Sequence, residues 1–598
     1  MNYRLHSKSR IAGGQSRPGD GRIRAAGIVL FLLGSLIIIR LFLLMILNHS
    51  FYTQIAAGSQ ELYEQLYPKR GSIFIQDTRS GEEFPLAINR DLFVVYADTR
   101  KIDDEKVAED IVEKLAATFQ YDDEKKLKVY TQLLKKDDPY EPIEQNVTEE
   151  VVESIKAQGL PGVGFVRRPY RFYPEGRLGA HLVGFVGKDE DGNDIGRYGV
   201  EGYWNNDLAG KAGFFEGAKS AGGGWIPLAG RVFEPAYDGA DLVLTVDRTL
   251  QFYACDKLRQ KAEEYGATSA ALILMDPQTG AILATCSVPD FDPNTYNKVD
   301  SGEVYNNTAI FTPYEPGSVF KPLTMAAALN ENLVGPQSPF YDKGYADGIC
   351  TKPIRNALDK TYQTQTMTGV LENSINTGMV YVAQQLGKER FRHYVEEFGF
   401  GVKEGIELET ESAGTIDSLS LNKGDAVDCY AATGSFGQGL TVTPLQMVTS
   451  FAALANGGKL MRPFVVSEVR YSDGKVTRTN PKVIDEVISP RASALISGML
   501  VSVVDNGHAK SAGVKGYYIA GKTGTAQIAG PGGYSEETNH TFVGFGPVDN
   551  PKFVGLVKFE KPRRAFADST AAPLFGDIAQ FTLKYYGIPP TRDGYKSE

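Results

Sequence analysis

Three short motifs place a hydroxyl, an amine and an amide in an order that suits acyl transfer to a serine. Along the chain they read Ser318-Val319-Phe320-Lys321, Ser374-Ile375-Asn376 and Lys522-Thr523-Gly524-Thr525. A serine hydroxyl is a weak nucleophile and needs a base that removes its proton. Residues three apart on a helix share one face, so Lys321 is expected beside the Ser318 hydroxyl. The motifs therefore predict a serine nucleophile with a lysine base.

The nucleophile is expected where a helix begins. Gly317 precedes Ser318 and permits a tight turn, and the N-terminal end of a helix favours developing negative charge. Lys321 can act as a base only if its pKa falls, and a second cation such as Lys522 close by lowers it. We therefore expect the first and third motifs to meet in space.

The second and third motifs contain groups that can hold a peptide. We expect Asn376 to hydrogen-bond the amide of a bound peptide and Ser374 to relay a proton to the leaving nitrogen. The segment Lys522-Thr523-Gly524-Thr525 lies on a predicted strand, which can pair with an extended peptide. Its cationic and hydroxyl groups can bind a terminal carboxylate.

Each motif taken alone is a weak signal. A second S-x-x-K occurs at Ser472-Asp473-Gly474-Lys475, where Asp-Gly predicts a turn rather than the start of a helix. A second S-x-N occurs at Ser420-Leu421-Asn422, whereas the K-T-G-T sequence occurs once. The order of the three motifs, and the local structure expected around each, indicate one active site.

The elements that must position these motifs form an α+β pattern. A short strand is predicted at 240–247, and a hairpin turning at Pro277-Gln278-Thr279-Gly280 follows. Helices are predicted at 249–265, 366–386 and 444–455, and three alternating stretches after residue 518 predict further strands. Strands, a large helical insert and more strands indicate a sheet flanked by helices.

Length, charge and cysteine usage limit the possible classes. At 598 residues the chain needs more than one domain, and a formal net charge of −10 argues against nucleic acid as a partner. The cysteines are widely spaced and contain no C-x-x-C pair, which argues against a zinc or redox motif. We expect core thiols, although export would allow one disulfide, whose pair the spacing does not choose. They are Cys255, Cys286, Cys350 and Cys429.

Residues 25–47 form an apolar run of about the length that a bilayer requires, interrupted by Arg40. The first lysine or arginine after the run is Lys69. Six basic residues precede it: Arg4, Lys8, Arg10, Arg17, Arg22 and Arg24. The positive-inside rule then places residues 1–24 in the cytoplasm and the chain after about residue 48 outside, as a single-pass membrane protein. A cleaved signal peptide is the alternative, but its apolar core would be unusually long.

The exterior part is expected to divide into two domains, 48–238 and 239–590. Glycines and prolines multiply between 210 and 240, which indicates the boundary. The lysine- and glutamate-rich stretch 103–160 predicts solvated helices. His181 adjoins an apolar run with no second histidine nearby, so we interpret it as structural rather than as a metal ligand.

From about residue 65 to about 585 the chain resembles the class B, monofunctional penicillin-binding proteins. Serine β-lactamases and penicillin-binding proteins share S-x-x-K, S-D-N and K-T-G motifs, and here Ile375 replaces the middle residue of the second. Further resemblance lies in the segments 68–77, 171–187, 196–213 and 235–251, and in YEPGSVFKPLT, ENSINTGMVYVA, GSFGQGLTVTPLQ and AGKTGTAQ. It implies an elongated pedestal, or dimerisation, domain before a transpeptidase domain with a central antiparallel sheet, flanking helices and a helical subdomain.

The resemblance implies a peptidoglycan D,D-transpeptidase. Ser318 would attack the D-Ala-D-Ala end of a stem peptide, D-alanine would leave, and an amine of a neighbouring strand would take the acyl group. The backbone N–H groups of Ser318 and Thr525 would form the oxyanion hole. β-Lactams would acylate the same serine, and no metal or organic cofactor is implied.

Other functions remain open at this point. D,D-carboxypeptidases and β-lactamases usually lack the pedestal, β-lactam sensors usually carry several membrane spans, and a non-catalytic scaffold would not need complete motifs. The chain before residue 240 has no room for a glycosyltransferase domain, so a membrane glycosyltransferase and other divisome or elongasome proteins are expected partners. SFGQGLTVTPLQ and HTFVGFGPVDNP resemble the division (septal) type more than the elongation type.

The charge asymmetry around 25–47 predicts the orientation of the chain. A reporter enzyme that works only outside the membrane should be active when fused after residue 60, because the six basic residues hold the N-terminus in the cytoplasm. Activity of a cytoplasm-only reporter at the same position would reverse the orientation.

Overall fold

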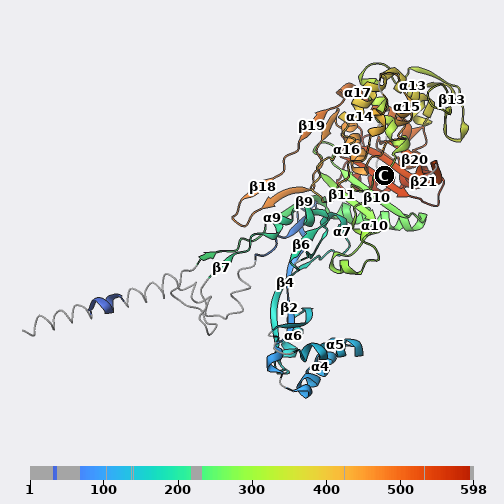
Figure 1. The fold of residues 1–598 in the computed structure, drawn as a ribbon. Coiled ribbons are helices and arrows are strands. Elements are labelled where there is room, and N and C mark those ends of the chain that lie inside the picture. The colour runs from blue at the N-terminus through green and yellow to red at the C-terminus, as the bar shows by residue number, and fades with distance from the viewer. Residues whose placement is uncertain are drawn as a thin grey trace, which may run out of the picture.

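The computed structural model of the chain describes residues 31–36 and 68–592, except 103, 136, 137, 139, 191, 217–231, 423 and 531–532 (Figure 1). Most of the predicted membrane segment 25–47 lies outside these residues. Among the helices that are described, none has both the length and the apolar composition needed to cross a membrane.

The larger domain is built on an antiparallel sheet buried between helices. Its five strands are ordered β11-β10-β22-β21-β20. They comprise β10 (Ser269–Met275), β11 (Ile282–Val288), β20 (Ala520–Gly530), β21 (Gly533–Gly546) and β22 (Phe553–Glu560). Six of the seven residues of β10 are buried, because helices cover both faces of the sheet. The predicted central antiparallel sheet is confirmed.

Two layers of helices enclose this sheet. On one face pack α10 (Arg248–Tyr265) and α18 (Ala571–Tyr585), which also contact each other. On the other face lies α16 (Pro444–Ala455), which is buried from Pro444 to Leu454. A capping box between Thr443 and Gln446 fixes the first turn of α16. This central helix separates the sheet from the helical subdomain.

The helical subdomain covers α16 on the side away from the sheet, which confirms the predicted helical insert (Figure 1). It comprises α11 (Lys321–Asn330), α12 (Met367–Glu372), α13 (Asn376–Leu386), α14 (Lys388–Glu397), α15 (Cys429–Gly434) and α17 (Pro490–Asp505). Short hairpins project from it: β12 (Pro339–Asp342) pairs with β15 (Gln363–Thr366), and β13 (Tyr345–Ala346) with β14 (Ile354–Arg355).

A second sheet joins the pedestal to the larger domain. Its path runs β18-β17-β9-β1-β2-β3, with β4 also paired to β2. The strands are β1 (Ile73–Gln76), β2 (Glu83–Ala97), β3 (Glu141–Val147), β4 (Val163–Phe172), β9 (Asp241–Asp247), β17 (Val466–Arg470) and β18 (Val476–Arg478). Because β1 pairs in parallel with β9, one sheet extends across the predicted boundary at 238/239, with a register shift between Phe74 and Gln76.

The far end of the pedestal is a small lobe with its own core (Figure 1). The charged stretch 103–160 forms α4 (Glu105–Phe119), α5 (Asp123–Leu133) and α6 (Glu149–Lys156), as predicted, but also the strand β3. Each helix buries one apolar face, for example Ile111 and Leu115 of α4. The charges lie on the opposite faces, which is why they dominate the sequence.

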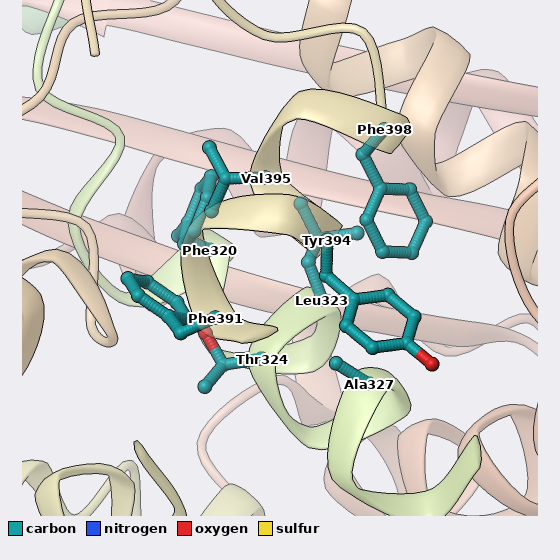
Figure 2. Close-up of a pocket in the computed structure, with 8 residues that line it drawn as sticks. All are labelled: Phe320, Leu323, Thr324, Ala327, Phe391, Tyr394, Val395 and Phe398. Carbon is teal, nitrogen blue, oxygen red and sulfur yellow. The ribbon is translucent and has the colours of Figure 1, made fainter. Parts of the chain in front are cut away.

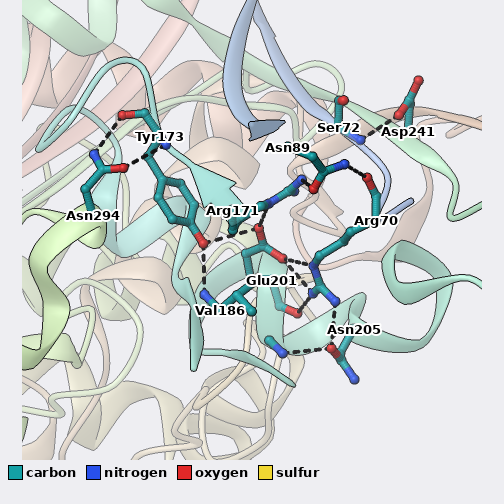
Figure 3. A network of polar contacts seen from close by, with 11 residues as sticks. Arg70, Ser72, Asn89, Arg171, Tyr173, Val186, Glu201, Asn205, Asp241 and Asn294 are labelled. Atoms are coloured by element: carbon teal, nitrogen blue, oxygen red, sulfur yellow. Dashed lines mark hydrogen bonds and ion pairs between the residues drawn. The ribbon is translucent and has the colours of Figure 1, made fainter. Parts of the chain in front are cut away.

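A buried glutamate links three separate segments of the pedestal (Figure 3). Glu201, in α8 (Gly199–Tyr203), is fully buried and accepts from Arg70 Nε at 2.7 Å and from Arg171 Nε at 2.6 Å. Arg70 also donates to Asn205 Oδ1 at 3.0 Å. One carboxylate thus fixes the chain before β1, the strand β4 and the helix α8 together.

The same network reaches the larger domain. The amide of Ser72 donates to Asp241 Oδ1 of β9 at 2.6 Å. The amide of Tyr173 donates to Asn294 Oδ1 at 3.0 Å, and Asn294 Nδ2 donates back to the Tyr173 carbonyl at 2.9 Å. The base of the pedestal is therefore tied to the larger domain by side chains as well as by the shared sheet.

The four cysteines form two disulfides rather than core thiols. Cys255–Cys286 joins α10 to β11, and Cys350–Cys429 joins the loop before β14 to α15. The partners are 31 and 79 residues apart, which sequence spacing alone could not match. His181 is buried, contacts the Val304 carbonyl through Nε2 at 2.8 Å and packs edge-on against Phe291, as a structural residue does.

The buried carboxyl of Glu404 should lower the free energy of unfolding as the pH rises from 4.5 to about 8. Burial raises the pKa of Glu404 from 4.5 to about 8, so the folded chain keeps a proton that the unfolded chain loses between these values. Glu404→Gln copies the protonated form, and we expect it to raise Tm by roughly a few degrees at pH 8 and by less at pH 5. Thermal unfolding at both pH values measures this.

Glu486→Gln is the matched control for Glu404→Gln, because Glu486 is exposed on β19 (Val483–Glu486). It should change Tm equally little at both pH values. A Glu404→Gln protein less stable than wild type at pH 8 would contradict the expected proton retention.

Candidate active site

The predicted nucleophile lies in a tight turn at the start of a buried helix. Residues Gly317–Phe320 form a 3₁₀ turn that continues directly into α11. Residues three apart eclipse each other in a 3₁₀ turn, so Ser318 and Lys321 share one face, as the S-x-x-K spacing predicts. Every residue from 316 to 329 is buried except Ser318, which is partly exposed. Its hydroxyl is therefore the group of this turn that a substrate can reach.

Two glycines allow the turn to approach β20 closely. Gly317 has φ +59°, and a Cβ there would lie 2.9 Å from the Cβ of Ala526. A Cβ on Gly524 would lie 3.1 Å from the Pro316 carbonyl oxygen and from Val319 Cγ1. Larger residues would separate the strand from the turn, so these glycines bring the first and third motifs together.

Lys321 connects the first motif to the second. Its fully buried Nζ donates to the Ser374 carbonyl at 2.5 Å, to Ser374 Oγ at 3.1 Å and to Asn376 Oδ1 at 2.8 Å. A neutral amine can donate to two of these acceptors at a time and keeps a lone pair that can take a proton. The two predicted motifs thus meet at one amine.

The second motif lies at a break between helices, so the single helix predicted at 366–386 is wrong. α12 ends at Glu372, α13 begins at Asn376, and Ser374 between them has φ +55°. This left-handed residue turns both its carbonyl and its hydroxyl toward Lys321. A continuous helix would bond that carbonyl within itself.

The third motif adds a second buried amine. Lys522 is fully buried on β20 and donates to the Thr523 carbonyl at 3.1 Å. Burial lowers the pKa of Lys522 to about 7. Burial, and next the charge of Lys522, hold the pKa of Lys321 well below its usual range. The expected influence of the second lysine is present, but burial contributes more.

The edge of β20 is free to receive a peptide. β20 ends the order of the five-stranded sheet, and no other described strand pairs with its second edge. Thr525 is partly exposed there, and its Oγ1 accepts from the Ala567 amide at 3.1 Å. Thr523 and Gly524 are buried beside it. The segment Lys522–Thr525 therefore offers backbone and hydroxyl groups next to the Ser318 turn.

The serines of the second S-x-x-K and second S-x-N sequences, Ser472 and Ser420, both lie in exposed turns. Asn422 of the second S-x-N sequence does accept from a buried lysine, Lys388, at 2.5 Å, but through its backbone carbonyl. Ser472 is exposed in the turn between β17 and β18, where Gly474 has φ +87°. Ser420 is exposed at the end of a 3₁₀ turn, Asp417–Ser420. The prediction of a turn at the second S-x-x-K sequence is confirmed.

A small apolar cavity lies behind the nucleophile turn, between α11 and α14 (Figure 2). It is lined by Phe320, Leu323, Thr324, Ala327, Phe391, Tyr394, Val395 and Phe398. Its volume of about 10 Å³ is about one water molecule's worth, so it belongs to the packing of the helix rather than to a ligand site.

Two groups near the site, the Arg355 carbonyl and His508, could not be predicted from the sequence. The Arg355 carbonyl accepts from Asn376 Nδ2 at 3.0 Å, and a backbone atom leaves no signal in residue identity. His508 has an exposed side chain, and desolvation followed by the charge of Lys522 lowers its pKa. It lies 14 residues before Lys522 with no motif around it, so only the fold relates the two.

Comparison with known families agrees with this geometry. Residues 270–580 match the family described as penicillin binding protein transpeptidase domain. Residues 65–244 match the family described as penicillin-binding protein dimerisation domain.

Individual relatives match over most of the chain. Stage V sporulation protein D of Bacillus subtilis is 34% identical over 90% of this chain and 82% of its own length. Penicillin-binding protein PbpB of Mycolicibacterium smegmatis is 33% identical over 73% and 68%, respectively. The crystal structure of penicillin-binding protein 3 of Mycobacterium tuberculosis with aztreonam is similar, with a TM-score of 0.66 and 26% identity over 88% of this chain and 98% of that one.

Proposed function

Because the chain belongs to the penicillin-binding proteins with a dimerisation and a transpeptidase domain, we propose that its Ser318 is the acylated nucleophile. The chain is a serine-type peptidoglycan D,D-transpeptidase, which cross-links stem peptides and binds penicillin. One observation carries the assignment of the residues: a fully buried lysine amine, Lys321, lies on the Ser318 turn and bonds both members of the second motif.

Acylation begins with a proton transfer. Neutral Lys321 accepts the Ser318 proton, and Oγ attacks the carbonyl carbon of the penultimate D-alanine. The backbone N–H groups of Ser318 and Thr525 bind the resulting oxyanion. As the C–N bond breaks, Ser374 passes a proton from Lys321 to the leaving nitrogen, and D-alanine departs. The product is an ester between Ser318 and the stem peptide.

Deacylation runs the same steps with a different nucleophile. The amine of a second stem peptide attacks the ester carbonyl, and its proton passes through Ser374 and Lys321 to the departing Ser318 oxygen. A new amide joins the two peptides, and the hydroxyl of Ser318 is restored. A β-lactam ester at the same oxygen would block this cycle.

Lys522 and the hydroxyls of Thr523 and Thr525 are proposed to hold the terminal carboxylate of the substrate. With a pKa of about 7, Lys522 is poised between its two forms, and an arriving carboxylate favours the cation. Its positive charge in turn keeps Lys321 neutral. The two lysines thus have unlike roles in one buried site.

The pedestal favours the transpeptidase over the other functions considered. The dimerisation family matches residues 65–244, which carboxypeptidases and β-lactamases usually lack. The complete set of buried contacts around Lys321 supports an acylated serine rather than a non-catalytic scaffold.

We also propose that the chain is anchored by residues 25–47 with its catalytic domain outside the membrane. Two disulfides support this placement, because such bonds persist in oxidising compartments.

A membrane glycosyltransferase would polymerise the strands that this protein cross-links. A role in cell division is favoured, and similarity to Stage V sporulation protein D adds a role in sporulation as a second candidate. The site of a fluorescent fusion during growth and sporulation tests this.

Removal of the nucleophile should abolish covalent labelling. Ser318→Ala is expected to take up no fluorescent penicillin while remaining folded, because one hydroxyl contributes only about 1 kcal/mol to stability. Ser472→Ala, in the exposed decoy turn, should label like wild type. Gel fluorescence with peptide mapping measures both, and undiminished labelling of Ser318→Ala would place the active site elsewhere.

Substitution by arginine should slow acylation more at Lys321 than at Lys522. A guanidinium cannot deprotonate, so Lys321→Arg should lower the second-order acylation rate by about 10³-fold. Lys522→Arg keeps a cation and should retain more activity. In wild type this rate should fall as pH rises through about 7, where Lys522 loses its proton, whereas Lys522→Arg should lack the fall.

Stopped-flow acylation by a β-lactam across pH measures these rates. The pH at which the rate falls is a property of the coupled pair of lysines rather than of Lys522 alone. Equal losses, or a larger loss at Lys522, would reject this division of roles while leaving the transpeptidase assignment intact.

A further inference from the structure

A buried aspartate outside the three motifs gathers four hydrogen bonds. Asp342, at the end of β12, is fully buried. Its Oδ1 accepts from Thr377 Oγ1 at 2.7 Å and from the Gly344 amide at 2.8 Å. Its Oδ2 accepts from Asn356 Nδ2 and from the Tyr362 amide, each at 2.8 Å. Donors occupy both oxygens, so the position of this carboxylate is fixed from several sides.

Two of these partners adjoin residues of the active site. Thr377 follows Asn376 at the start of α13, and Asn356 follows Arg355 at the end of β14. Asn356 Oδ1 also accepts from the Thr377 amide at 3.1 Å. Asp342 and Asn356 therefore hold the backbone on both sides of the contact between Asn376 Nδ2 and the Arg355 carbonyl.

This contact decides which way the Asn376 amide points. An asparagine amide carries donors on one atom and an acceptor on the other. With the Arg355 carbonyl held opposite, the nitrogen must face that carbonyl, and Oδ1 then faces Lys321 Nζ at 2.8 Å. The second N–H of Asn376 remains available to a peptide carbonyl. A reversed amide would set oxygen against oxygen at Arg355 and N–H against Lys321.

We propose that Asp342 and Asn356 are positioning residues for transpeptidation, which orient the Asn376 amide through Thr377 and the Arg355 carbonyl. The inference rests on the role proposed above for Asn376. Neither residue belongs to a motif, and Asp342 lies 34 positions before Asn376. Neither touches the reacting atoms, so their effect on the reaction must pass through Asn376.

A double-mutant cycle tests this route. Asp342→Asn changes one buried oxygen to an NH₂ group that cannot accept from its present donors. In the wild-type background it should lower the second-order rate of penicillin acylation by about tenfold or more, as expected when a catalytic group is misplaced. In an Asn376→Ala background it should lower that rate by less than about twofold, because coupled residues are non-additive.

A conservative pair at Thr377 covers the case in which Asp342→Asn fails to fold. Thr377→Ser keeps the hydroxyl that bonds Asp342 and should acylate like wild type. Thr377→Val keeps the shape and removes the donor, so it should lose acylation several-fold. Equal rates for the two variants would overturn the proposal.

Asp428→Asn controls for general destabilisation. Asp428 caps α15 and accepts from the buried Lys388 at 2.8 Å, and none of its hydrogen bonds involves a residue of the three motifs. The Asp428→Asn substitution should lower Tm without changing the acylation rate or the pH profile of that rate. The positioning role would be overturned if Asp342→Asn lowered the acylation rate by the same factor in the wild-type and the Asn376→Ala backgrounds. Wild-type acylation by Asn376→Ala alone would instead contradict the role proposed for Asn376.

Discussion

Two lysine amines buried in one site set the main constraint on this protein. Removing an ammonium group from water is costly, so Lys321 and Lys522 can remain buried only with acceptors around them or with lowered pKa values. The acceptors come from the break between α12 and α13, and the second amine comes from β20. The helical subdomain, the sheet and the Gly317 turn must therefore all be in place before the first amine has the chemistry of a base.

Part of this arrangement follows from the sequence. The spacing of Ser318 and Lys321 predicts a shared face, and it does so for a 3₁₀ turn as well as for a helix, because both bring residues three apart together. The central sheet and α16 also follow, since long apolar runs and turn residues are local signals. The first and third motifs lie where their local patterns predict, at the start of a helix and on a strand.

Other parts depend on contacts between distant segments. The left-handed Ser374 turns its carbonyl and hydroxyl toward Lys321, 53 residues earlier in the chain, and no local pattern encodes that contact. The disulfides and the pair Asp342–Asn356 join loops whose proximity no local pattern encodes. Glu201 is similar: its two arginine partners lie 131 and 30 residues away, and loss of such a buried partner would cost about 3–5 kcal/mol.

The long strand β2 has a mechanical consequence. Its 15 residues span about 50 Å at the usual rise per residue, pairing with β1 at one end and with β3 and β4 at the other. β1 in turn pairs with β9, which leads directly into α10 of the catalytic domain. A ladder of this kind cannot shear without breaking several bonds at once, so it behaves as a stiff beam. A sideways load on the distal lobe would reach the catalytic domain as torque rather than being absorbed at a flexible joint.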